Sequence, residues 1–201
     1  MMCVMTEIRQ AIMQDLPGVY RVCLLTGDAG SDATTLFRNP DLLGHVFVGP
    51  YVVGEPEHAL VVTDGDGVAG YCLAAPDTRR FAAWAEASWW PPLRAQYPRR
   101  NDGTRDAEII DLLHQPPIAE PAIVDTHPAH LHIDLLERVR GTGVGRRLIE
   151  RQLQLLRDAG APACHLSVAA SNDNAIAFYE HLGWRVLRTY EGELAMGIEL
   201  R

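Results

Sequence analysis

A glycine-rich junction between a strand and a helix places the strongest constraint on the fold of this 201-residue chain. Residues 140–145, R-G-T-G-V-G, follow an apolar strand-like run at 131–136 and open an amphipathic helix at 144–159. Three glycines remove side chains where a ligand would have to approach the backbone closely. The first helical turn then offers unpaired N–H groups and the positive end of the helix dipole to an anion. The sequence therefore predicts a phosphate or pyrophosphate cradle.

This loop matches neither of the two common nucleotide-binding motifs. It is not a P-loop, because no Gly-Lys-Ser/Thr follows the first glycines. It also departs from G-x-G-x-x-G, since its glycines alternate with Thr142 and Val144. Taken alone, the loop is equally compatible with a strand-to-helix turn that binds no ligand.

Composition narrows the class of partner. Hydrophobic residues make up 47% and charged residues 22% of the chain, as in ordinary soluble globular domains. A net charge of −8 argues against nucleic acid or an acidic membrane surface and favours a cationic substrate such as an amine. All 18 basic residues are arginine, which indicates a GC-rich coding bias, so we expect a bacterial source.

The cysteines and the N-terminus point to a cytoplasmic protein. The four cysteines lie far apart with no C-x-x-C pair, which favours reduced thiols. The N-terminus lacks the basic flank and apolar core of a signal peptide, and no apolar run is long enough to span a bilayer.

The order of expected elements predicts a single α/β (α+β) domain with a mixed central β-sheet flanked by helices. A doubly wound dinucleotide fold would need further parallel βα units, which the chain lacks. The chain is expected to begin with a helical stretch at 8–25, whose second segment is capped by Asp15, followed by a hairpin at 59–63 and 68–74. A helical insert is expected at about 77–117; its first helix is capped by Asp77 and stopped by Pro91-Pro92. A strand–helix–strand–helix run at 131–181 and a final hairpin at 185–189 and 193–200 follow.

Two motifs in the C-terminal half resemble a known family. Residues 140–145 are similar to the [QR]-x-x-G-x-[GA] pyrophosphate signature of the Gcn5-related N-acetyltransferases (GNAT). Residues 172–184, N-D-N-A-I-A-F-Y-E-H-L-G-W, resemble that family's N-x-x-A-x-x-[LF]-Y-E-x-x-G-[FW] segment. The resemblance covers about 130–190. It implies one GNAT domain over 1–201, with an acceptor-side part at about 1–125 and an acetyl-CoA-binding core at about 126–201.

A second resemblance runs through the N-terminal half. Residues 49–51, 68–71 with Asp77, and 88–97 look like the acetyltransferase-like C-terminal domain of the eukaryotic O-GlcNAc hydrolases. That domain is regarded as a pseudo-acetyltransferase with a degraded glycine loop. This chain keeps the loop glycines, so the resemblance still allows cofactor binding here.

The GNAT resemblance implies acetyl-CoA as the cofactor and assigns residues to it. Backbone N–H groups of the loop would hold the pyrophosphate, and the end of the strand would pair with the pantetheine arm. Asn172 occupies the position that holds this arm, whereas Asn174 could cap the next helix. Tyr179 would donate a proton to the leaving thiolate or hydrogen-bond it; its alternative is an aromatic residue on an amphipathic helix. The expected cofactor residues are Leu135, Leu136, Arg140, Gly141, Gly143, Val144, Gly145, Arg146, Asn172 and Tyr179.

The general base is less clearly marked. An ammonium nucleophile must lose a proton before it attacks, so a carboxylate, a histidine or a water chain is expected nearby. Asp134 is the first candidate, because the apolar residues of 131–135 share one strand face and leave His132 and Asp134 on the other. A polar strand face that pairs with neighbouring loops is the alternative. Asp77 is second, unless it only caps a helix. Asp77, Tyr71 and Trp90 are the expected acceptor-side residues.

The histidines and the expected partners complete the prediction. His127, His130 and His132 have the spacing H-x-x-H-x-H without a further ligand at a recognised distance, so no metal site is expected. The partners expected are acetyl-CoA and an amine acceptor, with no nucleic acid and no membrane. The sequence also allows a homodimer. The implied function is direct acetyl transfer to a primary amine of a small molecule or a protein lysine. The alternative is a catalytically inactive module that binds CoA or a protein.

Overall fold

The computed structural model describes residues 6–200, and over that range the strands form one seven-stranded mixed sheet. The strand order is β1-β2-β3-β4-β5-β7-β6. Neighbouring strands are antiparallel except β4 and β5, which are parallel. This arrangement confirms the predicted mixed sheet. The strands are β1 (Glu7–Gln10), β2 (Ala59–Asp64), β3 (Gly67–Ala75), β4 (Ala129–Leu135), β5 (Ala163–Ala169), β6 (Arg185–Tyr190) and β7 (Glu193–Glu199).

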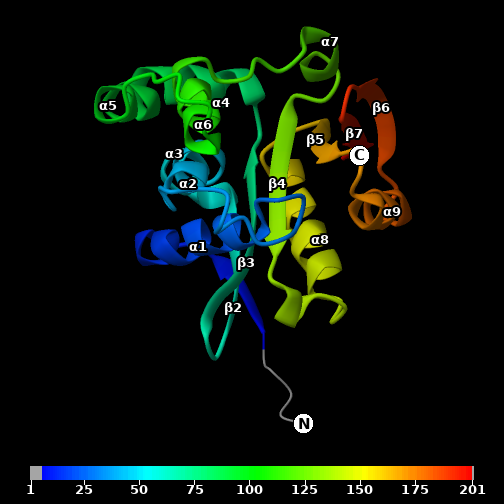
Figure 1. Cartoon of the computed structure of the whole chain (residues 1–201). Helices are drawn as coiled ribbons and strands as arrows, with labels where there is room; N and C mark the ends of the chain where they lie inside the picture. Colours follow the sequence, from blue (N-terminus) through cyan, green and yellow to red (C-terminus); the bar gives the residue numbers. More distant parts are fainter. Residues whose placement is uncertain (1–5, 201) are drawn as a thin grey trace.

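Helices cover both faces of the sheet (Figure 1). Helices α1 (Leu16–Thr26), α2 (Leu42–Phe47) and α3 (Gly49–Gly54) lie on one side, and α8 (Val144–Asp158) lies on the other. Helix α9 (Asp173–His181) packs on the same core as α8. The remaining elements are the α-helices α4 (Thr78–Trp84), α5 (Trp90–Gln96), α6 (Arg105–His114) and α7 (Pro121–Val124), the π-helical turn η3 (Ala85–Trp89), and the 3-10 turns η1 (Met13–Asp15), η2 (Pro56–His58) and η4 (Glu137–Val139).

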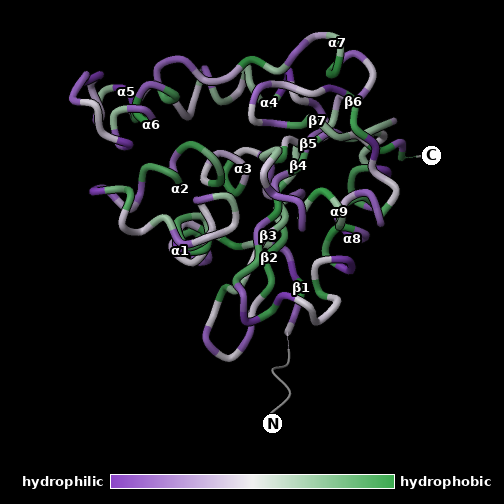
Figure 2. The backbone as a smooth tube through the Cα atoms, turned by 45° about the vertical axis from the view of Figure 1, so that its right-hand side comes forward, coloured by the Kyte–Doolittle hydropathy of each residue, from purple (hydrophilic) through white to green (hydrophobic). Residues whose placement is uncertain are grey.

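Two apolar layers hold the helices to the sheet. Strand β3 is buried along almost its whole length, because α1 packs on one of its faces and α8 on the other. The central strands β2 and β3 accordingly include hydrophobic stretches in Figure 2. Helix α8 contributes Leu148, Ile149 and Leu156, each with none of its surface exposed. Full burial of one such side chain stabilises the fold by about 1.5–3 kcal/mol, so this interface anchors the helix that follows the glycine loop.

The prediction of a helix from residue 8 is wrong at its beginning. Residues 7–10 form β1, an edge strand that pairs with β2 from Glu7–Thr63 to Gln10–Leu60. Backbone pairing to the sheet therefore overrides the helical pattern there. The second segment is confirmed, since α1 begins directly after Asp15. The Asp15 carboxylate does not cap it, however, and instead accepts from Ile12 N at 2.9 Å and pairs with Arg9.

The helical insert is confirmed, but its first helix does not stop at Pro91-Pro92. The chain passes from α4 through the π-helical turn η3 into α5, which continues to Gln96. The two prolines occupy the first turn of α5, where a missing N–H leaves no intrahelical bond unmade. Asp77 caps α4, since its Oδ1 accepts from Arg80 N at 3.0 Å.

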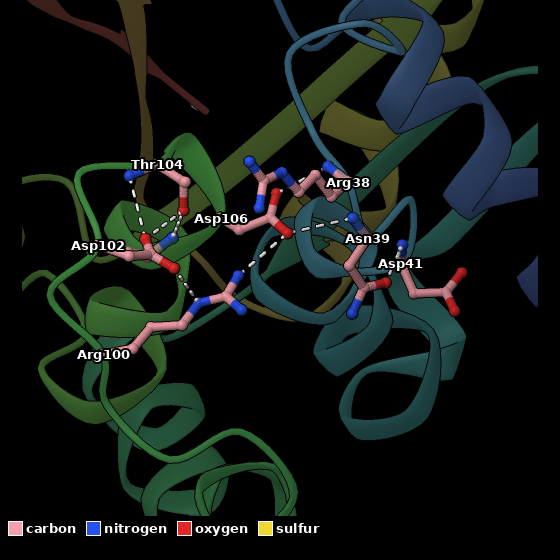
Figure 3. Close-up of polar contacts among 8 residues, drawn as sticks. Arg38, Asn39, Asp41, Arg100, Asp102, Thr104 and Asp106 are labelled. Atoms are coloured by element: carbon pink, nitrogen blue, oxygen red, sulfur yellow. Dashed lines mark hydrogen bonds and ion pairs between the residues drawn. The ribbon is translucent and has the colours of Figure 1, made fainter.

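A buried carboxylate ties the insert to the loop before α2 (Figure 3). Asp106 on α6 is 2% exposed and accepts from the backbone N–H groups of Arg38, at 2.9 Å, and Asn39, at 3.2 Å. The Arg100 guanidinium also donates to it, at 3.1 Å. These bonds fix the insert against the N-terminal helices and thereby shape the space between them.

The described residues contain no helix with the length and apolarity needed to cross a bilayer. Cys23, Cys72 and Cys164 are buried, free thiols, and burial raises the pKa of each. Cys3 lies outside the described residues.

Candidate functional site

The two parallel strands at the centre of the sheet pair only at their first residues. Ala129 lies opposite Cys164 and His130 opposite His165, after which β4 follows β3 and β5 follows β7. The strands therefore diverge toward the glycine loop. A cleft of about 2350 Å³ runs from this loop, through the gap between β4 and β5, to the helical insert.

The glycine loop forms one end of the cleft. Gly141 and Gly143 have φ values of 73° and 78°, in the left-handed region that favours glycine, and nothing lies within 4 Å of a Cβ built on either. Gly143 is the N-cap of α8. Within the described residues, the backbone N–H groups of 141–146 donate to no backbone carbonyl. These N–H groups and the open space beside them suit an anion.

A second loop, residues 27–31, lies against the glycine loop and lines the same end of the cleft. The Arg140 guanidinium joins the two, donating from Nε to Leu135 O at 2.8 Å and from Nη2 to Gly30 O at 2.9 Å. Asn172 Nδ2 donates to Ala29 O at 3.4 Å. Sequence patterns alone assigned no role to this loop, because the residues that it contacts are distant in the chain.

The backbone of β4 contradicts the prediction that Leu136 pairs with the pantetheine arm. Leu136 N donates to Ala69 O at 2.8 Å, so this N–H faces β3 and cannot pair with a ligand in the gap. Neighbouring residues of a strand direct their backbone groups to opposite edges. Leu135 and Ile133 therefore face the gap, and both line the cleft, whereas Leu136 is buried.

The N-cap of α9 is not the asparagine that the sequence suggested. Asn172, not Asn174, caps α9, because its Oδ1 accepts from Ala175 N at 3.1 Å. Asn174 lies inside the first turn of the helix. The cap uses the side-chain carbonyl oxygen of Asn172, and both asparagines line the cleft.

Tyr179 reaches the cleft from α9 and belongs to the apolar core under α8. It is 8% exposed and packs beside Phe178 and Trp184, with ring centroids 5.7 and 5.8 Å away. Burial, together with the carboxylate of Asp134, raises the pKa of the Tyr179 hydroxyl above its usual range. The hydroxyl therefore keeps its proton at neutral pH.

Asp134 lines the cleft from the other face of β4, where it lies between a tyrosine and a histidine. Its Oδ2 accepts from Tyr71 Oη at 2.6 Å and lies 3.0 Å from His132 Nε2. His132 Nδ1 lies 3.2 Å from the carbonyl oxygen of Phe47. Tyr71, which the sequence placed on the acceptor side, is fully buried and is absent from the described residues that line the cleft, so it can act there only through its hydrogen bond to Asp134.

His130, two residues earlier, is held by neutral partners. Thr78 Oγ1 donates to Pro128 O at 2.7 Å, so it can accept from His130 Nδ1, also at 2.7 Å. Tyr51 Oη lies 2.7 Å from His130 Nε2 and donates to it. Burial, with His165 and His132 nearby, lowers the pKa of His130 to about 3. This ring is neutral at physiological pH.

Aromatic side chains line the insert end of the cleft. Tyr51 and Phe81 stack with their ring centroids 4.4 Å apart. Trp90, for which the sequence suggested an acceptor-side role, also lines the cleft. Asp77 is absent from the described residues that line it, and its carboxylate is engaged at the N-terminus of α4. The sequence assigned no acceptor role to Phe47, Tyr51 or Phe81, because only the fold brings α2, α3 and α4 to β4.

A family comparison decides the class of protein. The model of the acetyltransferase (GNAT) family matches residues 36–184. The chain belongs to this family. The GNAT resemblance seen in the sequence is confirmed, and acetyl-CoA is the cofactor that the family uses.

Solved structures share the fold along the whole chain. The crystal structure of SsHAT is 36% identical, has a TM-score of 0.92, and matches 98% of each chain. The structure of yncA from Salmonella typhimurium, solved with its cofactor acetyl-CoA, is 16% identical with a TM-score of 0.55; the match covers 98% of this chain and 94% of that one.

Curated relatives are longer proteins. Protein O-GlcNAcase from Rattus norvegicus is 23% identical over 189 residues, which is 92% of this chain but 20% of that protein. Mycothiol acetyltransferase from Nocardiopsis dassonvillei is 27% identical over 159 residues, which is 75% of this chain and 46% of that protein. The chain thus spans about a fifth of the O-GlcNAcase length, and the resemblance to the O-GlcNAc hydrolases is confirmed.

Proposed function

We propose that this protein is an acetyl-CoA-dependent N-acetyltransferase that transfers the acetyl group directly to a primary amine. One observation carries the proposal: a single cleft connects an anion cradle at the glycine loop with Tyr179 and Asp134 at the gap between β4 and β5. Tyr179 and Asp134 come from opposite faces of the sheet, so the divergence of the two strands is what brings them to one space.

The residues present fit acetyl-CoA. Backbone N–H groups of Gly141, Gly143, Val144, Gly145 and Arg146 would hold the pyrophosphate, since none of them donates to a backbone carbonyl of the described chain. The edge of β4 at Leu135 and Ile133 would pair with the pantetheine arm, and Asn172 would contact it across the cleft. Acetyl-CoA supplies an acetyl group activated as a thioester.

Two side chains would move protons during transfer. Asp134 takes a proton from the attacking nitrogen as the new C–N bond forms, through Oδ1, to which no protein group of the described chain donates. Tyr179 donates its hydroxyl proton to the sulfur as the C–S bond breaks, and its raised pKa keeps that proton available. Thiol and amide would be the products. Transfer of a proton from the Asp134 carboxyl to the Tyr179 phenolate through solvent would then restore both side chains, so that atoms and protons balance.

Both parts of the chain contribute to this site. The sequence assigned residues 1–125 to the acceptor and 126–201 to the coenzyme. Phe47, Tyr51 and Trp90 are consistent with an acceptor wall in the first part. Residues 27–31 also belong to the first part, yet lie beside the glycine loop, so we propose that they contact the coenzyme as well.

Release of free thiol from acetyl-CoA, measured with a panel of primary amines, tests the proposal. Amine-dependent thiol release with formation of the acetylated amine is the expected result. Binding of acetyl-CoA without transfer to any amine of the panel would contradict it, and would instead favour a non-catalytic module.

A further inference from the structure

The hydrogen-bond partners of His132 define where its protons are. The carbonyl oxygen of Phe47 can only accept, so His132 Nδ1, at 3.2 Å, must carry a proton. Nε2 lies 3.0 Å from Asp134 Oδ2, which also accepts from Tyr71. If Nε2 carried no proton, its lone pair would face the negatively charged carboxylate, which is unfavourable. If Nε2 carries a proton as well, it donates to the carboxylate, and the ring is a positively charged imidazolium.

Every group facing His132 agrees with a cationic ring. Asp134 is the only carboxylate of the described chain that pairs with it, Tyr71 and Cys23 are neutral, and His130 is neutral. Burial opposes the charge, but the hydrogen bond and the charge of Asp134 outweigh it, so the pKa of His132 lies above its ordinary value.

The consequence falls on Asp134. Its negative charge is compensated by His132, and one of its oxygens is fully used by two donors. Such a carboxylate attracts an ammonium ion weakly and is a poor base toward one. It can still accept a proton from nitrogen once the C–N bond is forming, because the nitrogen then becomes far more acidic.

The other acidic side chains that line the described cleft do not replace it. Glu86 pairs with Arg94 at 2.5 Å, and Glu120 pairs with Arg188 and Tyr190. Glu193 lies opposite Ala169, at the end of β5 that leads to Asn172 and the glycine loop. The acceptor end of the cleft therefore offers aromatic walls without an uncompensated carboxylate.

We propose that the acceptor is a weakly basic amine, such as a peptide α-amino group or an amino sugar, and not an alkylammonium such as a lysine side chain; this inference rests on the proposed N-acetyltransferase function. In this account His132 is the residue that sets specificity. It acts through Asp134, so it is a positioning residue whose charge decides which protonation state of the amine is accepted.

The size of the effect follows from free-base fractions. At pH 7 about 10% of a peptide α-amino group with a pKa near 8 is neutral, against about 0.04% of a lysine side chain with a pKa near 10.4. A site that takes the free base and helps little with deprotonation should therefore favour the α-amine about 100-fold or more in kcat/KM.

Matched acceptors test the inference. The first is alanyl-glycyl-alanine amide, which offers a peptide α-amino group. The second is Nα-acetyl-alanyl-lysyl-alanine amide, which offers only a lysine side chain. The third is glucosamine, an amino sugar, so that the first and third distinguish the two kinds of weakly basic amine. We expect the first or the third to exceed the lysyl peptide at least 100-fold in kcat/KM at pH 7. In His132→Gln this ratio should fall at least tenfold, because the uncompensated Asp134 can then hold and deprotonate an ammonium. The control is His181→Gln, an exposed position on α9, which should keep the native ratio.

A spectroscopic readout stands apart from activity. In the native protein, ¹⁵N NMR should show both nitrogens of His132 protonated at pH 7, and Asp134→Asn should lower the pKa of the ring. A neutral His132 ring at pH 7, a native preference for the lysyl peptide, or a ratio unchanged by His132→Gln would overturn the inference while leaving the proposed function intact. Transfer to none of the three amines would overturn both.

Discussion

At the scale of single residues, two histidines on β4 show how position in the fold decides protonation. His130 and His132 are two residues apart and share one strand face, so the sequence gives them similar surroundings. Their partners differ: Tyr51 and Thr78 hold a neutral His130, whereas the hydrogen bond and charge of Asp134 and the carbonyl group of Phe47 raise the pKa of His132. These partners come from distant segments, which is why sequence patterns could place the residues but could not assign their charge.

His130 should make the fold sensitive to acid. The unfolded ring takes a proton near pH 6.5, but the folded ring does so only near its lowered pKa of about 3. Its contribution to stability is therefore complete above pH 6.5 and declines as the pH falls from 6.5 toward 3. Urea unfolding of the native protein and of His130→Gln should show a steeper loss of unfolding free energy in the native protein over pH 6.5–4. Parallel pH profiles would contradict this.

Tyr179 should matter for turnover and little for stability. Its hydroxyl makes no hydrogen bond within the described protein, so Tyr179→Phe removes no internal contact. Loss of a positioned proton donor typically lowers the rate about 10²-fold. We expect kcat to fall by about that factor, with Tm and acetyl-CoA affinity essentially unchanged, in steady-state kinetics and thermal unfolding. An unchanged kcat would assign the proton to another donor.

At the scale of elements, the strand–loop–helix unit around the glycine loop was predictable because its signals are local. The apolar run, the glycines and the amphipathic period lie within 30 residues and agree with β4 and α8. Errors occurred where pairing or continuity depended on distant partners: β1 is defined by β2, and α5 continues through Pro91-Pro92 after a π-helical turn. Local propensity could not report either effect.

The glycine loop can be tested with two substitutions at one position. At Gly143, with φ of 78°, any side chain is strained, but nothing lies within 4 Å of the new Cβ. Gly143→Ala therefore measures the strain alone, at about 1 kcal/mol of stability. Gly143→Asp adds a carboxylate beside the expected pyrophosphate, so its affinity for acetyl-CoA should fall at least tenfold below that of Gly143→Ala. Equal affinities in the two variants, measured by calorimetry, would place the pyrophosphate elsewhere.

At the scale of the whole molecule, the cleft is assembled from segments that the sequence keeps far apart. One space is lined by residues 27–31, Phe47, the helical insert, and strands β4 and β5. Sequence motifs located the end of the cleft at which we propose that the coenzyme binds, because the loop and α9 carry recognisable patterns. They could not locate the acceptor wall, which depends on how the insert is held against α2 and α3.

The Asp106 contact should be a main support of that arrangement. Asp106→Ala removes a buried carboxylate and leaves the N–H groups of Arg38 and Asn39 without their acceptor. We expect a loss of about 2–4 kcal/mol in the free energy of unfolding, measured with urea. Asp41→Ala on the same loop is the control, since its side chain is exposed, and should change stability by less than about 0.5 kcal/mol. Equal, small effects would show that other contacts hold the insert.

The central claim is that the cleft between β4 and β5 binds acetyl-CoA with its pyrophosphate at the glycine loop. Isothermal titration calorimetry of the native protein with acetyl-CoA tests it most directly. The predicted result is one site per chain with a dissociation constant of about 1–100 µM, in the range usual for enzyme substrates. The absence of binding at millimolar acetyl-CoA, with the protein folded, would contradict the account.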